Sequence, residues 1–142
     1  MAGGNASDVR QPWPMGEDSV LVFPVAFGAV TEGAAKVTLA TFTLPFAAYC
    51  EKAEMSLASV TDTDGDSLVI VEDDTAVTTK KWVSAGDLGT TSATPVTKDL
   101  AVDKSVLINA GAVITVSVTG GDAGDAVGAG CLFLWLKPKK VR

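Results

Sequence analysis

Apolar and polar residues alternate along most of the chain after residue 18, as they do in strands with one face in a core and the other in solvent. In "AVITVSVTG", for example, Thr115 and Ser117 stand between branched apolar residues. A helical period is hard to find, and turn residues separate the segments at intervals of about ten residues. The strand signal is carried by the segments 20–27, 35–44, 45–61, 67–73, 75–83, 95–102, 105–111, 112–120 and 131–137. The pattern predicts eight or nine short strands in an all-β sandwich or barrel.

Some segments depart from simple alternation. Pro24 limits its segment to an edge strand or a bulged strand, because proline has no N–H for the sheet ladder. The stretch "FAAYCEKAEM" is rich in helix formers and predicts an irregular segment that leads into a strand. Asp73 and Asp74 predict a hairpin turn, and residues 84–94 predict a loop. The last segment, "CLFLWLK", is apolar on both faces, so we expect it to be buried on both sides or to lie at a subunit contact.

Composition predicts one domain with an extended arm before it. The chain has 142 residues, of which 47% are hydrophobic and 20% are charged, as in a globular protein. Residues 1–18 have small residues, prolines and no periodicity, so we expect a flexible N-terminal arm followed by a domain over 19–142. The motif "QPWPM" places Trp13 between two prolines, which favours an extended backbone. Trp13 either anchors the arm on a partner or folds back on its own domain.

The net charge of −6 argues against a general nucleic-acid binder. The apolar stretch from Val20 to Val30 is too short to cross a bilayer, so we expect no membrane partner. The charge is unevenly spread, because the last six residues, "KPKKVR", hold four of the eleven basic residues. The rest of the chain has seven basic and seventeen acidic residues. This basic tail is either a solvated terminus or a site that docks on an acidic neighbour.

The stretch "TDTDGDSL", residues 61–68, allows two interpretations. Aspartates at alternate positions are typical of a calcium loop, but an EF-hand has glycine at its sixth position, where Ser67 stands here. No helical pattern flanks the stretch. An Asp-Gly pair between strand segments is a strong hairpin signal, because glycine takes positive φ at no steric cost. We therefore favour a sharp turn over a metal site, and we expect no metal or other cofactor.

No catalytic constellation is visible. The chain has no histidine, so the commonest general base is missing and serine or threonine nucleophiles lack an activating partner. The glycine-rich "GGDAGDAVGAG" has no lysine and no strand–loop–helix pattern, so we expect a flexible loop rather than a phosphate site. Cys50 and Cys131 are too few for a disulfide scaffold and have no metal-type spacing.

From about Phe42 onward the chain resembles small jelly-roll virion proteins of tailed bacteriophages, the capsid decoration (cement) proteins and head-fibre domains. The resemblance rests on four pieces in order: "FTLPFAAYC", "GDSLVIVEDD", "LINAGAVITVSVTG" and "AVGAGCLFLWLK". Together they cover about 100 residues. The resemblance implies an eight-stranded jelly roll, a homotrimer, and a place on the outer surface of the capsid. The departures from the family are the very apolar last strand and the basic tail.

The implied function is non-enzymatic: the protein would bridge major capsid subunits and stabilise the capsid. The arm would contact the capsid through Pro12, Trp13, Pro14 and Met15, and subunits would meet at Leu132, Phe133, Leu134 and Trp135. Jelly rolls commonly pair their first and last strands, which would bring Cys50 near Cys131, with both thiols reduced.

Two alternatives use the same fold. One is a receptor- or glycan-binding domain of a phage head or tail fibre, although Trp13 is the one tryptophan that the pattern leaves free. The other is a cupin-type enzyme, which would normally need metal-binding histidines. Fold alone does not decide among them.

Overall fold

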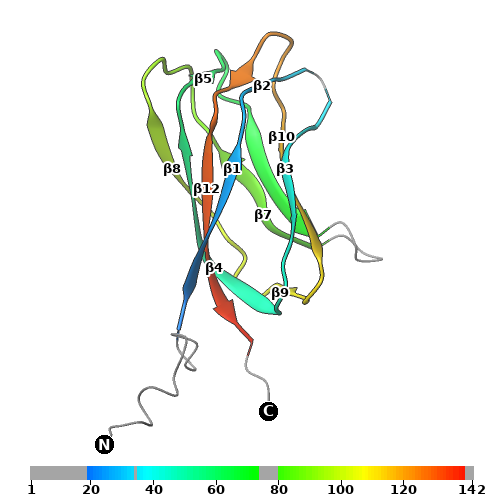
Figure 1. Cartoon of the computed structure of the whole chain (residues 1–142). Coiled ribbons are helices and arrows are strands. Elements are labelled where there is room, and N and C mark those ends of the chain that lie inside the picture. The colour runs from blue at the N-terminus through cyan, green and yellow to red at the C-terminus, as the bar shows by residue number, and fades with distance from the viewer. Residues whose placement is uncertain (1–18, 34, 74–79, 140–142) are drawn as a thin grey trace, which may run out of the picture.

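The structure is a computed structural model that describes residues 19–33, 35–73 and 80–139, and these residues form an all-β sandwich (Figure 1). Eight strands have five or more residues: β1 (Leu21–Phe27), β3 (Val37–Thr43), β4 (Ala48–Leu57), β6 (Leu68–Asp73), β7 (Lys80–Asp87), β8 (Val96–Leu100), β10 (Val113–Thr119) and β12 (Gly130–Pro138). Four more are two-residue strands: β2 (Val30–Thr31), β5 (Val60–Thr61), β9 (Leu107–Ile108) and β11 (Ala126–Val127).

The eight longer strands have jelly-roll connectivity. One sheet has the order β1-β12-β4-β8, with β9 also paired to β4, and the other has the order β3-β10-β6-β7. Consecutive long strands therefore alternate between the two sheets, except for β6 and β7, which pair directly. This arrangement confirms the predicted fold class. The expected count of eight holds for the longer strands, and the short strands add to it.

The last strand, β12, lies in the middle of its sheet. It pairs with β1 over seven residues, from Leu21 opposite Leu136 to Phe27 opposite Gly130, and with β4 on its other side. The first and last strands are therefore neighbours, as expected for a jelly roll. β1 pairs only with β12 and is an edge strand, which confirms the prediction from Pro24.

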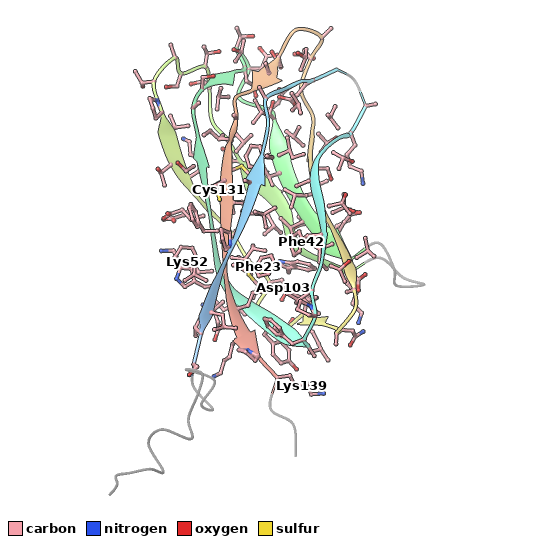
Figure 2. The ribbon with its side chains drawn as sticks, in the orientation of Figure 1. Phe23, Phe42, Lys52, Asp103, Cys131 and Lys139 are labelled. Carbon is pink, nitrogen blue, oxygen red and sulfur yellow. The ribbon has the colours of Figure 1, made fainter. Side chains whose placement is uncertain are left out.

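The core fills the space between the two sheets. From β12, the side chains of Leu132, Leu134 and Leu136 point inward and are at most 1% exposed. Valines and isoleucines of β10 and β6 meet them from the other sheet. Phe23 of β1 and Phe42 of β3 stack across one open side of the sandwich, with ring centroids 5.1 Å apart (Figure 2). Aromatic pairs in such contacts contribute about 0.5–1.5 kcal/mol beyond their buried area.

The two ends of the sandwich differ. A small sheet of order β2-β11-β5 closes one end, and the first and last described residues lie at the other end (Figure 1). None of the described residues forms a helix long and apolar enough to cross a membrane.

Three sequence predictions were wrong in detail. The segment 46–55 is not irregular, because β4 begins at Ala48 and continues to Leu57. A bulge at Glu51–Lys52 shifts its alternation, so Ala48 and Cys50 point inward before the bulge and Ala53 and Met55 after it. This shift hides the strand period in the sequence. The predicted loop at 84–94 also begins too early, because β7 extends to Asp87 and pairs with β6. The turn of that hairpin lies outside the described residues.

The third error concerns the cysteines, which are both free but not close. Cys131 lies opposite Ser56, six positions along β4 from Cys50, which is on the order of 20 Å. Cys50 points into the core, whereas Cys131 is partly exposed on the outer face. Burial raises the pKa of the Cys50 thiol to about 12, and the neighbouring Glu51 carboxylate adds to this effect.

We predict that Cys50 does not react with a maleimide in the folded protein. Its thiol is inaccessible, and its raised pKa leaves almost no thiolate at mildly alkaline pH. The measurement is intact mass after labelling of the C131S variant, with and without denaturant. One adduct should form only in denaturant. The C50A variant, whose single thiol is Cys131 on the outer face, is the matched control and should label while folded in dilute solution, where that face is open. Equal labelling rates for the two folded variants would contradict the prediction.

Candidate assembly surface

The outer face of the five-stranded sheet is apolar where β1 and β12 pair. Residues directly opposite each other in an antiparallel pair point to the same face. The register therefore places three pairs side by side on this face, and we call these six residues the apolar strip: Val22 with Trp135, Pro24 with Phe133, and Ala26 with Cys131.

The apolar strip is open to solvent. Val22 is 51% exposed, and Val20, which stands just before β1, is 41% exposed. Phe133 and Trp135 are half-buried by their neighbours. The corresponding face of the other sheet is polar, because the edge strand β3 exposes Thr38, Thr41 and Thr43 there. An exposed face of an antiparallel sheet ordinarily carries polar residues, so the strip is a candidate interaction surface.

Trp135 is the centre of a small group of side chains. Its ring lies 6.5 Å from the ring of Phe133, tilted by 53°. The Lys52 Nζ atom lies 4.8 Å from the Trp135 centroid, a cation–π contact, and 3.9 Å from Glu54 Oε2. Lys52 comes from β4, on the outer side of the sheet (Figure 2). The tryptophan therefore has an apolar neighbour on one side and a charged one on the other, as is common at the rim of an interface.

The structure divides the four predicted interface residues into two groups. Phe133 and Trp135 belong to the apolar strip, whereas Leu132 and Leu134 are buried in the core of the same chain. The sequence left open whether this strand is buried on both sides or lies at a contact. The structure buries its inner face and leaves its outer face half-exposed. The predicted arm residues Pro12, Trp13, Pro14 and Met15 lie outside the described residues.

The two tryptophans in described strands have different surroundings. Trp82 is 1% exposed in β7 and belongs to the core, in line with its place in a strand. Trp135, which we predicted to lie at a subunit contact, is partly exposed on the outer face of β12. The sequence signal was the alternation in "CLFLWLK", where leucines on one face alternate with cysteine and aromatics on the other.

The aspartate-rich stretch forms a sharp turn at the opposite end. Asp62 is fully buried and accepts backbone N–H bonds from Asp64, Gly65 and Ser67 at 3.2, 2.9 and 2.8 Å. Burial would raise the pKa of the Asp62 carboxyl, but these donors together outweigh it and hold the pKa below its usual value. Gly65 has φ of +71°, as the Asp-Gly signal predicted. The hairpin prediction was nevertheless wrong, because β5 pairs with β11 and β6 pairs with β10 and β7.

The glycine-rich segment, for which we predicted a flexible loop, packs closely against this turn. Gly120 has φ of +86°, and a Cβ there would collide with the Asp66 carbonyl oxygen. A Cβ at Gly121 would collide with the carboxylate of Glu32. The segment also contains β11, which pairs with both β2 and β5. Its glycines therefore allow close approach between loops, and no helix follows it within the described part of the chain.

No family model matches the sequence, and no curated protein matches it. Among solved structures, the chain is similar to a protein in the structure of the Gx strain of infectious bursal disease virus, with a TM-score of 0.46 and 15% sequence identity. The alignment covers 88% of this chain and 34% of the viral chain. A VP2 subviral particle of the same virus gives a TM-score of 0.47 at 13% identity, with 84% and 33% covered. The chain thus spans about a third of the length of these proteins.

We predict opposite roles for the neighbouring residues Leu134 and Phe133. In dilute solution, Leu134→Ala should lower the free energy of unfolding by about 2–5 kcal/mol, because it leaves a cavity in the core. Phe133→Ala should give a clearly smaller loss, because its side chain is half-exposed on the outer face. Denaturant unfolding followed by circular dichroism measures both. Equal losses would mean that the two faces of β12 are not distinguished as described.

Proposed function

We propose that the protein is a non-enzymatic capsid decoration (cement) protein that trimerises and bridges major capsid subunits on the outer head surface of a bacteriophage. The observation that carries the proposal is the apolar strip, an exposed apolar face on a domain whose core is already complete. The sequence resemblance to small jelly-roll virion proteins supports the same function. A protein with this role acts through its surfaces and needs no reactive group, in keeping with a chain that has no histidine.

The subunit contact would use the apolar strip. Trp135 and Phe133 are of the residue types that dominate binding energy at interfaces, and they stand at the middle strand of the sheet. Lys52 and Glu54, which flank them on β4, would form the polar rim. Burying this face would remove Val22, Phe133 and Trp135 from water without requiring any change in the core.

The capsid contact would use the end of the sandwich where the two termini lie. Val20 leads into β1 there, so an arm formed by residues 1–18 would start beside the apolar strip and could carry Pro12, Trp13, Pro14 and Met15 to a neighbouring subunit. Lys137 and Lys139 lie at this same end, and the aspartate turn lies at the other (Figure 1). This separation of charge would direct the basic end toward an acidic capsid surface.

A second candidate is a receptor- or glycan-binding domain of a phage fibre, and the partial exposure of Trp135 favours it. An exposed aromatic ring with charged neighbours can stack on a sugar face. On this reading the strip would stay open in the isolated protein and bind a saccharide. The first reading needs the strip to be covered by another copy of the chain. The two readings therefore differ in the oligomeric state.

We expect the purified protein to have about three times the chain mass of 14.5 kDa in light scattering. Phe133→Lys should shift it to the monomer mass, because it places a charge in the proposed contact while Glu54 opposite can pair with it in the monomer. Thr41→Lys, on the outer face of the other sheet, adds the same charge and should stay trimeric. A wild-type monomer whose tryptophan fluorescence responds to saccharides would favour the fibre domain.

Deletion of residues 1–18 should leave a folded domain but weaken its attachment to capsids. The arm is proposed to extend the contact area, so its loss should reduce affinity without changing the core. Co-sedimentation with purified capsids that lack the protein measures attachment, and circular dichroism confirms the fold. The W13A variant of the full chain tests whether the Trp13 side chain alone accounts for the contribution of the arm. Unchanged co-sedimentation of the deletion variant would show that the arm has no part in attachment.

A further inference from the structure

Two acidic loops meet at the end of the sandwich that carries β2, β11 and β5. The turn after β5 contributes Asp62, Asp64 and Asp66, and the loop before β11 contributes Asp122 and Asp125. Carboxylate oxygens of Asp62, Asp66 and Asp125 all lie within 4.8 Å of one another, and so do those of Asp64, Asp66 and Asp122. Asp66 belongs to both groups, so it stands at the centre of the cluster.

A buried carboxylate with an unpartnered oxygen lies beside this cluster. Glu32 is 5% exposed, and its Oε1 atom is buried without a hydrogen-bond partner among the described residues. Its Oε2 atom accepts a bond of 2.8 Å from Ser67 Oγ, beside Asp66. Its Oε1 atom lies against Gly121, beside Asp122, and its backbone N–H bonds to the Asp125 carbonyl at 2.7 Å. The Glu32 carboxylate is therefore enclosed between the two acidic loops.

The carboxylates of this cluster form no ion pair with a lysine or arginine among the described residues. Within the described ranges, the ion pairs are Lys36–Glu72 and Lys52–Glu54, neither of which involves the cluster. Burial raises the pKa of the Glu32 carboxyl, and the carboxylates of Asp125, Asp62 and Asp66 add to this effect, which exceeds the opposing Ser67 bond. Buried charges and unpaired buried oxygens are costly, and a bound cation would offset both costs.

The oxygen atoms fit a hard divalent cation. An ionised carboxylate offers about four lone-pair sites, and Asp62 uses three of them for backbone N–H groups, which fixes its orientation. Two oxygens that bind one Ca²⁺ at about 2.4 Å are at most about 4.8 Å apart, and the oxygens of Asp62, Asp66 and Asp125 lie within this limit. Calcium accepts six to eight oxygens in irregular geometry, whereas magnesium requires a near-ideal octahedron.

We propose that this end of the protein binds Ca²⁺, with Asp66, Asp62 and Asp125 as ligands and Glu32 as the buried charge that the ion compensates. The cation joins the turn after β5 to the loop before β11, which are far apart in sequence. Water completes the coordination on the exposed side, where Asp66 reaches solvent. The site is independent of the apolar strip and of the proposed function.

The test uses the full chain after treatment with a chelator and its removal. Calorimetric titration with CaCl₂ should give saturable binding. At a Ca²⁺ concentration about a hundred times Kd, the melting temperature should rise by about 10 °C over the chelated protein. Asp66→Asn should reduce the affinity at least tenfold and remove most of the rise. Without Ca²⁺ it should melt no lower than wild type, because it removes a like charge. Asp99→Asn, an exposed residue of β8, removes the same charge elsewhere and should respond as wild type does.

Three results would overturn the proposal. The first is the absence of both binding heat and a shift in melting temperature with Ca²⁺. The second is an equal response of the Asp66 and Asp99 variants, which would show general screening of an acidic protein rather than a site. The third is an equal shift with MgCl₂ at the same concentration, which would show that the cluster does not select Ca²⁺. Glu32→Gln adds an independent readout, since it should weaken Ca²⁺ binding and raise the melting temperature of the chelated protein.

Discussion

The structure depends on the pairing of β12 with β1 on one side and with β4 on the other. This pairing joins the first strand of the domain to the last, so it closes the sheet from distant parts of the chain. It fixes the phase of β12 and turns Leu132, Leu134 and Leu136 into the core. A slip of one residue would exchange the leucines for Cys131, Phe133 and Trp135, because strand side chains alternate with a period of two. The register thus determines both the core and the apolar strip.

The same register gives the molecule an asymmetric surface. One sheet presents apolar residues of β1 and β12 to solvent, and the other presents the threonines of β3. Both backbone edges of β12 are already paired, so no strand from another subunit can add to it. A partner can contact β12 only through its outer face. Assembly through this surface would therefore be sheet against another surface rather than continuation of a sheet across subunits. Among the described residues, the edge strands of this sheet are β1, β8 and β9, and Pro24 interrupts the row of N–H groups along β1.

The two ends of the sandwich have different chemistry for topological reasons. The termini leave at one end because β1 and β12 are antiparallel neighbours. The loops that connect the sheets at the other end gather aspartates that the chain places sixty residues apart. The buried Asp62 stabilises its turn through three backbone N–H bonds, so part of this acidic cluster serves folding directly. The glycines of the second loop permit the close approach that brings Asp122 and Asp125 to the turn.

The sequence by itself determined the fold class, because alternation with a period of two requires no knowledge of partners. It also limited Pro24 to an edge strand or a bulged strand and indicated positive φ at Gly65. It could not show which face of β12 is inside, since both are apolar. It also could not show that β4 is one continuous strand, because the bulge shifts its alternation. Only the tertiary structure decided that the aspartate turn is no hairpin, that Cys50 and Cys131 are apart, and that Glu32 meets the acidic loops. These facts depend on contacts between residues distant in sequence, and those contacts are set by the pairing of strands rather than by any local pattern.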